Sequence, residues 1–324
     1  MLDPATLQSQ MKDSIESDRL RRKARFQATV AQFKAAKAKA SSQPPISGPA
    51  AVQSLLQGQP VAPTVPPEPL FMVAIGDSWF DYPIIDNDTS TYGNCTDIIK
   101  QLPSLATPTP NIFKLAHAGD ATTAEMGLPK RQRLIATLID PNNWPGGYPD
   151  AILISGGGDD IAGDQFCILL DSALDGPQGL NQVRLNLVLG AIEASYRDLF
   201  LLRNRYAPGV PIFGHTYDFP IPNGVHPFCA GPWLKPSLDE CGWTDPVQAR
   251  QIVQNVLLAF GARLKSLADD PANNFILIQT QNTLSDDSYW ANELHPTEGG
   301  FGLLAQRFVR ALHAKFGNRI TLES

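Results

Sequence analysis

Two residues of this chain have the chemistry of a nucleophile and its base. Ser78 directly follows an apolar run of strand length in the stretch LFMVAIGDSW, residues 70–79. His295 lies in NELHPTEGGF, just before a stretch with helical periodicity. A serine hydroxyl becomes a strong nucleophile when an adjacent base takes its proton, and histidine is the commonest such base. The pair predicts acyl transfer if the fold brings these two distant segments together.

Two glycine-rich segments could stabilise the negative charge that develops on oxygen in such a reaction. AHAGDATT contains Gly119 and follows the apolar run 111–115, and GGGDDI contains Asp159 and follows the run 150–155. Backbone N–H groups of loops of this kind form oxyanion holes. We therefore expect the oxyanion hole to be built by Ser78, Gly119 and the loop that carries Asp159.

The elements that must position these residues alternate between strand and helix patterns. Apolar runs of strand length occupy 70–75, 111–115, 150–155, 210–214 and 275–280. Helical patterns lie between and after them, at about 94–102, 121–138 in two pieces, 179–206, 246–268 and 298–316. The alternation predicts a three-layer α/β/α sandwich around a five-stranded parallel sheet with flavodoxin-like winding. In such a sheet the residues that follow the strands meet at the carboxyl edge, where open α/β sheets bind their ligands.

Two segments do not fit the plain alternation, and both follow strands. They cover 161–178 and the long aromatic, proline-rich stretch 217–245. Long ordered insertions at a sheet edge often build a binding wall or lid, although the tryptophans of the second segment could equally pack within it. We expect substrate contacts from Trp79, Gly158, His215 and Trp233.

The N-terminal region differs from the rest of the chain in composition. Residues 1–40 carry a formal charge of +5 and are rich in helix-forming residues, and 41–69 contain eight prolines. The sequence predicts a basic helical segment (1–40), a proline-rich linker (41–69) and a hydrolase domain (70–324). Three interpretations of the helix stay open: a partly solvated helix, docking on the body or a partner protein, or contact with an anionic membrane surface.

Composition excludes several other classes of protein. The chain has 324 residues, of which 43% are hydrophobic, as expected of a globular protein with a sizeable core. Residues 41–324 carry a formal charge of −11, which argues against a nucleic-acid-binding core. The first 40 residues lack the apolar stretch of a signal peptide, which leaves the cytoplasm or signal-independent export. Four cysteines fit no metal cluster; Cys229 and Cys241 could form a bridge, or all four could be free thiols.

The order of these motifs resembles the SGNH (GDSL-type) esterase/lipase family, over about residues 70–316. Gly76-Asp77-Ser78-Trp79 resembles its first block, Gly119 its second, Gly157-Gly158-Asp159-Asp160 its third and Asn292-Glu293-Leu294-His295 its last. The resemblance implies a serine hydrolase that needs no metal or cofactor and acts on a small-molecule, lipid or glycan ester. It also implies that Ser78 is the nucleophile, His295 the base and Asn292 its partner.

The chain departs from the family pattern at two of these positions. Asp159 replaces the asparagine of the oxyanion hole, and an ionised carboxylate there would repel the oxyanion. Burial or the neighbouring charge of Asp160 could keep it protonated. Asn292 replaces the aspartate that orients the histidine: its oxygen can accept a hydrogen bond but cannot offset the charge of the imidazolium ion. Glu293, Asp286 or Asp287 could take over that role.

These departures leave two alternatives beside the ester hydrolase. The first is a metal-dependent phosphoesterase that uses Asp77, Asp159, Asp160 and His295 as oxygen and nitrogen ligands. The second is a binding module on the same fold with impaired catalysis. Loss of activity on chelation favours the first, and failure of Ser78 to react with a fluorophosphonate favours the second.

Overall fold

The computed structural model describes residues 4–42, 67–82, 97–226 and 231–323. The chain divides into two compact units. One comprises Met1–Glu68 with Asp140–Tyr148, and the other comprises Pro69–Ile139 with Pro149–Ser324.

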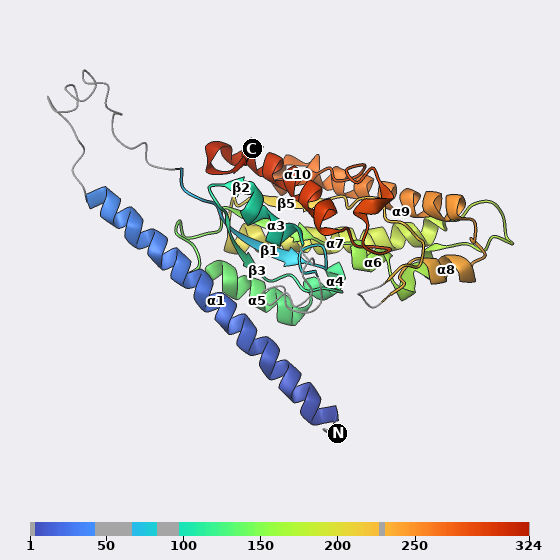
Figure 1. Ribbon diagram of the computed structural model, residues 1–324, viewed down its shortest axis with the longest axis horizontal. Coiled ribbons are helices and arrows are strands. Elements are labelled where there is room, and N and C mark those ends of the chain that lie inside the picture. Colours follow the sequence, from blue (N-terminus) through green and yellow to red (C-terminus); the bar gives the residue numbers. More distant parts are fainter. Residues whose placement is uncertain (1–3, 43–66, 83–96, 227–230, 324) are drawn as a thin grey trace, which may run out of the picture. The chain divides into compact units, whose positions relative to one another are not determined.

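The second unit is built on a parallel five-stranded sheet (Figure 1). Its strands lie in the order β3-β1-β4-β5-β6 and comprise β1 (Phe71–Gly76), β3 (Asn111–Lys114), β4 (Ala151–Ser155), β5 (Ile212–His215) and β6 (Phe275–Ile278). β1 therefore lies between β3 and β4, which are the next two strands of this sheet along the chain. This order is the flavodoxin-like winding. The predicted three-layer α/β/α sandwich is confirmed. β5 begins two residues later than predicted, at Ile212, because Pro211 has no N–H to donate to a neighbouring strand.

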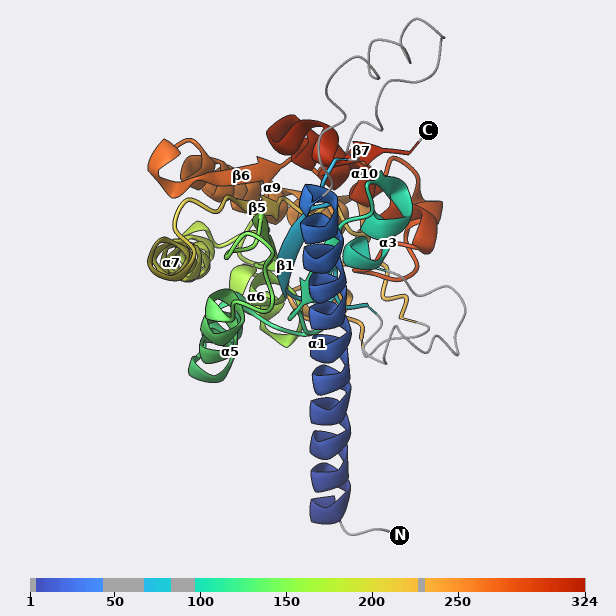
Figure 2. The same cartoon turned by 90° about the vertical axis from the view of Figure 1, so that its left-hand side faces the viewer.

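Helices cover both faces of this sheet. They comprise α3 (Ile98–Leu105), α4 (Thr122–Glu125), α5 (Leu128–Ile139), α6 (Gly158–Ile161), α7 (Gln182–Tyr206), α8 (Lys235–Glu240), α9 (Pro246–Ala268) and α10 (Glu298–Phe316). α3 packs against α10, while α7 packs against both α5 and α9. Figure 2 shows α3 and α10 on the opposite side of β1 from α5 and α7. Right-handed crossovers require this arrangement, because the chain winds in opposite directions from β1 to β3 and from β3 to β6.

Short elements complete the unit. They are the 3₁₀ turns η2 (Asp164–Leu169), η3 (Pro271–Asn273), η4 (Asp287–Tyr289) and η5 (Gly317–Arg319), and the antiparallel pair β2 (Ala106–Thr107) and β7 (Thr321–Leu322). α10 begins after Thr297, whose hydroxyl accepts the N–H of Gly300 at 3.2 Å. Thr297 is therefore the N-cap of α10. This cap fixes the start of α10 at Glu298, three residues beyond His295.

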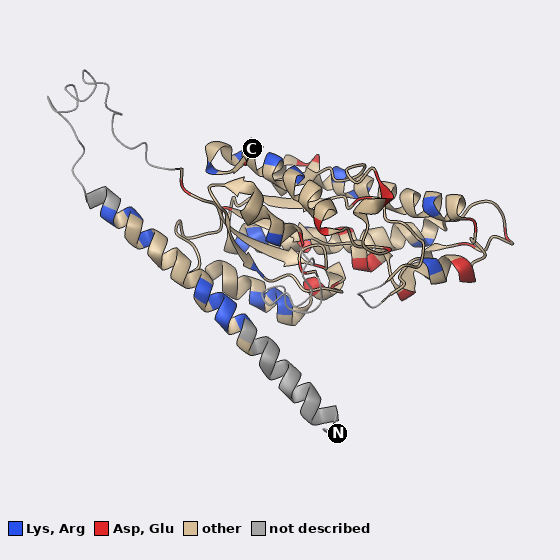
Figure 3. Cartoon of the chain, viewed as in Figure 1, with Lys and Arg blue, Asp and Glu red and all other residues tan. Residues whose placement is uncertain are grey.

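The first unit contains the long basic helix α1 (Pro4–Ser42), and Figure 3 colours the described Lys and Arg residues of its ribbon blue. Within this unit α1 is held by residues 140–148. Phe26 meets Trp144 edge to face at 5.7 Å between ring centroids, and Gln27 Nε2 donates to Asn143 Oδ1 at 2.9 Å. Lys34 Nζ donates to the carbonyl of Pro141 at 2.9 Å. The expected contact of α1 with a partner or an anionic membrane stays a prediction.

Two other predictions fall on parts of the chain that are not described. Residues 43–66 of the expected linker lie outside the described ranges, as do Cys95 and Cys229. The bridge between Cys229 and Cys241 therefore stays a prediction. None of the described helices combines the length and the apolar composition that crossing a bilayer requires.

The end of β1 approaches β4 very closely. Gly76 has φ +128°, and a Cβ built there would lie 2.0 Å from the carbonyl oxygen of Ser155. The next residue, Asp77, donates its N–H to that same carbonyl at 2.9 Å. Only glycine fits a positive φ against a neighbouring backbone at this distance. The turn that presents Ser78 therefore depends on Gly76.

We predict that Gly76→Ala lowers the free energy of unfolding by about 3 kcal/mol or more, since the new methyl group must displace backbone. Gly190→Ala in α7 is the matched control, because a Cβ there meets nothing within 4 Å. Removing a helical glycine should stabilise the protein by up to about 1 kcal/mol. Urea denaturation of both variants measures the difference, and equal effects would contradict the close approach.

Candidate active site

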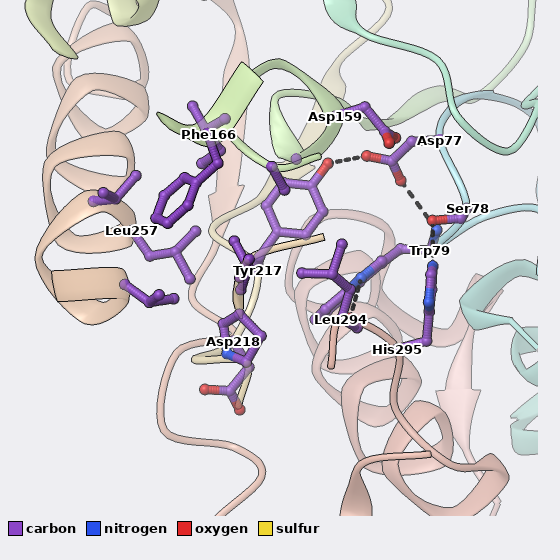
Figure 4. A pocket seen from close by; sticks show the side chains of 17 residues that line it. Asp77, Ser78, Trp79, Asp159, Phe166, Tyr217, Asp218, Leu257, Leu294 and His295 are labelled. Carbon is purple, nitrogen blue, oxygen red and sulfur yellow. Dashed lines mark hydrogen bonds between the residues drawn. The ribbon is translucent and has the colours of Figure 1, made fainter. Parts of the chain in front are cut away.

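Ser78 and His295 lie in direct contact at the carboxyl edge of the sheet (Figure 4). His295 Nε2 lies 2.7 Å from Ser78 Oγ, and His295 Nδ1 lies 3.1 Å from Asn292 Oδ1. The nucleophile turn and the histidine loop are also tied by the Trp79 indole, which donates to the carbonyl of Leu294 at 3.3 Å. Two segments 217 residues apart therefore form a Ser–His pair with an amide as its third member.

The orientation of the Asn292 amide is fixed by its other contacts. Its Oδ1 accepts the backbone N–H groups of Leu294 at 3.0 Å and of His295 at 2.8 Å. Backbone N–H groups only donate, so the atom that faces them must be the oxygen. The imidazole nitrogen that contacts this oxygen must then be the protonated one. Nε2 is left with a lone pair toward Ser78, which is the tautomer that a general base needs.

Burial keeps His295 neutral. The side chain is almost completely buried, and this desolvation lowers its pKa to about 3. Trp233 meets the imidazole edge to face at 5.3 Å. His295 is therefore neutral, with an unprotonated Nε2, at any pH well above 3.

A network of buried polar side chains lies behind the nucleophile. Asp77 Oδ1 accepts the N–H of Trp79 at 3.0 Å and the hydroxyl of Ser155 at 2.5 Å, and the Tyr217 hydroxyl bonds the other carboxyl oxygen. His215 Nε2 lies 3.0 Å from Ser155 Oγ. Burial raises the pKa of Asp77 well above its ordinary value, and the nearby Asp159 raises it further. Asp77 thus shapes the turn, as expected of an aspartate in this position.

His215 lies at a different place from the one expected. It is buried, its ring stacks with Trp79 at 5.4 Å and Phe80 at 5.9 Å, and it does not line the pocket beside Ser78. The Tyr217 N–H donates to His215 Nδ1 at 3.2 Å, so Nε2 carries the proton toward Ser155. As the last residue of β5, His215 has a buried side chain outside the pocket lining, and its expected contact with substrate stays a prediction.

A pocket opens beside Ser78 and holds about 530 Å³ of empty space, including its mouth. Its polar residues are Asp77, Ser78, Asp159, Tyr217, Asp218 and His295, and Trp79 and Gly158 also line it. Its remaining walls are apolar, formed by Ile161, Ala162, Phe166, Pro220, Leu234, Val253, Val256, Leu257 and Leu294. Both unassigned segments of the sequence, 161–178 and 217–245, contribute to this wall. Figure 4 shows Phe166 and Leu257 facing the side of the pocket away from His295.

Trp233, Gly119 and Asp159, the other residues expected at the site, differ in whether they line this pocket. Trp233 borders His295 but does not line the pocket. Gly119 is exposed, has φ +84° and also lies outside the pocket lining. Asp159 lines the pocket, and burial together with Asp160 raises its pKa to about 6. Of the three groups expected to form the oxyanion hole, Ser78 and Asp159 line the pocket and Gly119 does not.

The aspartates beside the nucleophile have other partners than a metal ion. Asp160 Oδ2 accepts the Thr122 N–H at 2.7 Å, and Asp160 Oδ1 accepts the Thr122 hydroxyl at 2.9 Å. Both oxygens of Asp77 are likewise engaged, as described above. Within the described ranges, no three His, Cys, Asp or Glu side chains are arranged to hold a metal ion.

Glu293 joins the insertion to the histidine loop. The carboxylate is fully buried and accepts the backbone N–H groups of Trp233 at 2.6 Å, Leu234 at 2.8 Å and Lys235 at 2.7 Å. A fourth N–H, that of Gly224, lies at 3.3 Å. Glu293 therefore points into the insertion and away from His295.

The two other acidic candidates for orienting His295 are also engaged elsewhere. Asp287 forms a bidentate ion pair with Arg250 at 2.8 and 3.0 Å, and Asp286 caps the N–H of Ser288 at 2.8 Å. The sequence could not decide among these carboxylates, because loop residues next to one another in sequence point in different directions.

The chain is similar to solved structures but matches no family model and no curated protein. Similar solved structures include a protein named a GDSL-like lipase from Bacteroides ovatus ATCC 8483, with a TM-score of 0.45 and 12% identity. That match covers 80% of this chain, which spans only 56% of the length of that structure.

Two further structures are similar over most of their own length. An extracellular lipase from Streptomyces rimosus has a TM-score of 0.46 and 15% identity, and the match covers 75% of this chain and 98% of the lipase. Phospholipase A1 from Streptomyces albidoflavus NA297 has a TM-score of 0.45 and 15% identity, with coverages of 75% and 98%. At such low identity the chemistry must be argued from this chain's own residues.

We predict that Glu293→Gln lowers the free energy of unfolding by about 2–4 kcal/mol, because the new NH₂ group would face backbone donors that a carboxylate satisfies. Hydrogen exchange should accelerate at the amides of Trp233, Leu234 and Lys235. Asp286→Asn is the control, since Asp286 is exposed and caps a single N–H. Unchanged exchange at the three amides in Glu293→Gln would contradict the contact.

Proposed function

We propose that this protein is a serine ester hydrolase that acts through an acyl-enzyme on Ser78. The observation that supports it best is the 2.7 Å contact of Ser78 Oγ with the unprotonated nitrogen of His295. Nucleophile and base within hydrogen-bond distance, with the base oriented by a third group, are the signature of nucleophilic acyl transfer.

In the proposed reaction, Ser78 Oγ attacks the ester carbonyl carbon while its proton passes to His295 Nε2. The tetrahedral intermediate collapses as His295 returns that proton to the departing alkoxy oxygen, whose bond to carbon breaks. A water molecule then attacks the carbonyl carbon of the acyl-enzyme and gives a proton to His295 Nε2. The bond from that carbon to Ser78 Oγ breaks as His295 returns the proton to this oxygen, which releases the carboxylic acid and restores the Ser78 hydroxyl. No step requires a metal ion or cofactor.

The oxyanion would be held by the N–H groups of Ser78 and Gly119 and by Asp159 in its neutral form. A protonated carboxyl donates a hydrogen bond to the oxyanion, whereas a carboxylate repels it. The raised pKa of Asp159, near 6, supports this role because the acid form is accessible in mildly acidic solution.

The pocket lining favours esters of uncharged, apolar acyl groups. Nine apolar residues wall the space next to Ser78, and three aspartates (Asp77, Asp159 and Asp218) line it without a lysine or arginine among the described lining residues. Burying an anionic acyl group there would cost more than burying an alkyl chain. We therefore propose lipid-like or other apolar acyl esters as substrates, with insertion 217–245 forming part of the acyl wall.

We predict that Ser78→Ala loses at least about 10³-fold in kcat/KM on p-nitrophenyl esters and no longer reacts with a fluorophosphonate. Ser104→Ala, on the exposed side of α3, makes the same change away from the pocket and should retain full activity. Peptide mapping of the labelled wild type should find the modification on Ser78. Hydrolysis that persists in Ser78→Ala but stops with a chelator would favour the phosphoesterase, and absence of labelling in the wild type would favour the binding module.

The pH dependence should be unusual for a serine hydrolase. Neutral His295 persists down to its pKa of about 3, and neutral Asp159 persists up to about 6. Activity should therefore be highest between these values and fall about tenfold per pH unit above the pKa of Asp159. Asp159→Asn supplies a permanently neutral donor, so it should retain activity at pH 8.

Rate measurements from pH 4 to 9 compare the wild type with Asp159→Asn, and Asp164→Asn serves as the exposed control. At pH 8, Asp159→Asn should exceed the wild type by about 10-fold or more, because little wild-type Asp159 is then protonated. A wild-type rate that stays flat from pH 6 to 8 would contradict the neutral-donor role.

A further inference from the structure

Tyr82 is buried against the imidazole ring of His295. The two rings are stacked, with 4.5 Å between their centroids and 21° between their planes. The side chain is 3% exposed. Its hydroxyl lies 3.4 Å from Asn292 Nδ2, so Tyr82 contacts both the base and the group that orients it.

Among the described residues, no carboxylate contacts the base of the proposed reaction when it gains its positive charge. When His295 takes the proton of Ser78, Nδ1 faces the neutral oxygen of Asn292. Carboxylates on neighbouring segments are bound elsewhere: Glu293 by backbone N–H groups, Asp287 by Arg250, and Asp81, next to Tyr82, by Lys114 at 2.6 Å. Asp77, Asp159 and Asp218 line the pocket, and burial raises the pKa of each.

The face of an aromatic ring carries negative charge density and attracts a cation whose centre lies within about 6 Å of the ring centroid. The stacking distance of His295 over Tyr82 meets this condition, and burial of both rings strengthens the attraction. We propose that Tyr82 is a positioning residue whose ring face stabilises the imidazolium form of His295 in place of the missing aspartate. The inference rests on the proposed function.

Replacing the ring and replacing only the hydroxyl should have different effects. Tyr82→Phe keeps the stacked face and should stay within about threefold of the wild type in kcat, whereas Tyr82→Leu should lose about tenfold or more. The loss should appear in kcat and not in KM, because the charge exists only during proton transfer. Thermal unfolding of each variant verifies that the protein is folded at the assay temperature.

Restoring a carboxylate should make the ring less important. In an Asn292→Asp background the charge of His295 has a direct partner. Tyr82→Leu should then cost less than about threefold in kcat, a smaller loss than in the wild type. An equal loss in both backgrounds would show that the ring has a packing role only, and would overturn the proposal.

A second measurement is independent of turnover. Proton–carbon NMR follows the titration of the His295 ring in the wild type, in Tyr82→Phe and in Tyr82→Leu, and His295→Gln assigns the signal. The pKa of His295 should be lower after Tyr82→Leu and unchanged after Tyr82→Phe; equal values in all three proteins would overturn the inference. If the wild type neither hydrolyses esters nor labels on Ser78, the proposed function fails, while this titration still decides the role of the ring.

Discussion

The oxygen of one amide side chain receives three N–H groups in this structure, and the geometry of the site depends on it. Asn292 Oδ1 accepts two backbone N–H groups of its own loop and faces the imidazole of His295. The backbone contacts determine which end of the amide faces the ring, and the ring in turn presents its lone pair to Ser78. A carboxylate at this position would supply charge as well as orientation. The amide supplies orientation alone, so any stabilisation of the charged base must come from other groups.

The pocket region contains two kinds of buried carboxylate, and they differ in their hydrogen-bond donors. Glu293 and Asp218 accept several backbone N–H groups each and hold separate loops together. Asp77 and Asp159 both line the pocket, and burial favours the protonated form of each. A neighbouring carboxylate adds to this effect, Asp159 for Asp77 and Asp160 for Asp159. The first kind is structural in its contacts. The second kind gives the pocket a negative charge that depends on pH.

Much of the fold follows from sequence because its signals are local. The apolar run before Ser78 and the alternation of strands with helices were enough to predict the sheet, and the helical pattern at 298–316 predicted α10. Ser78 and His295 could be brought together because both were expected at the carboxyl edge. The places of His215, Glu293 and Tyr82 could not be predicted in this way. Each depends on the direction of one side chain within a buried cluster, for which sequence spacing carries no signal. Tyr82 lies only four residues after Ser78, and this proximity was the one available hint.

The contact between residues 78 and 295 also bears on how the site is assembled during synthesis. A growing chain that has been translated through β6 already contains the nucleophile turn, the acidic residues and both segments that wall the pocket. It still lacks the loop that carries His295 and Leu294, whose carbonyl accepts the indole N–H of Trp79. The Ser–His pair can therefore form only after the loop before α10 has been added, and α10 then supplies further residues of the hydrophobic core. A nascent or C-terminally truncated form would enclose a serine without a base to activate it.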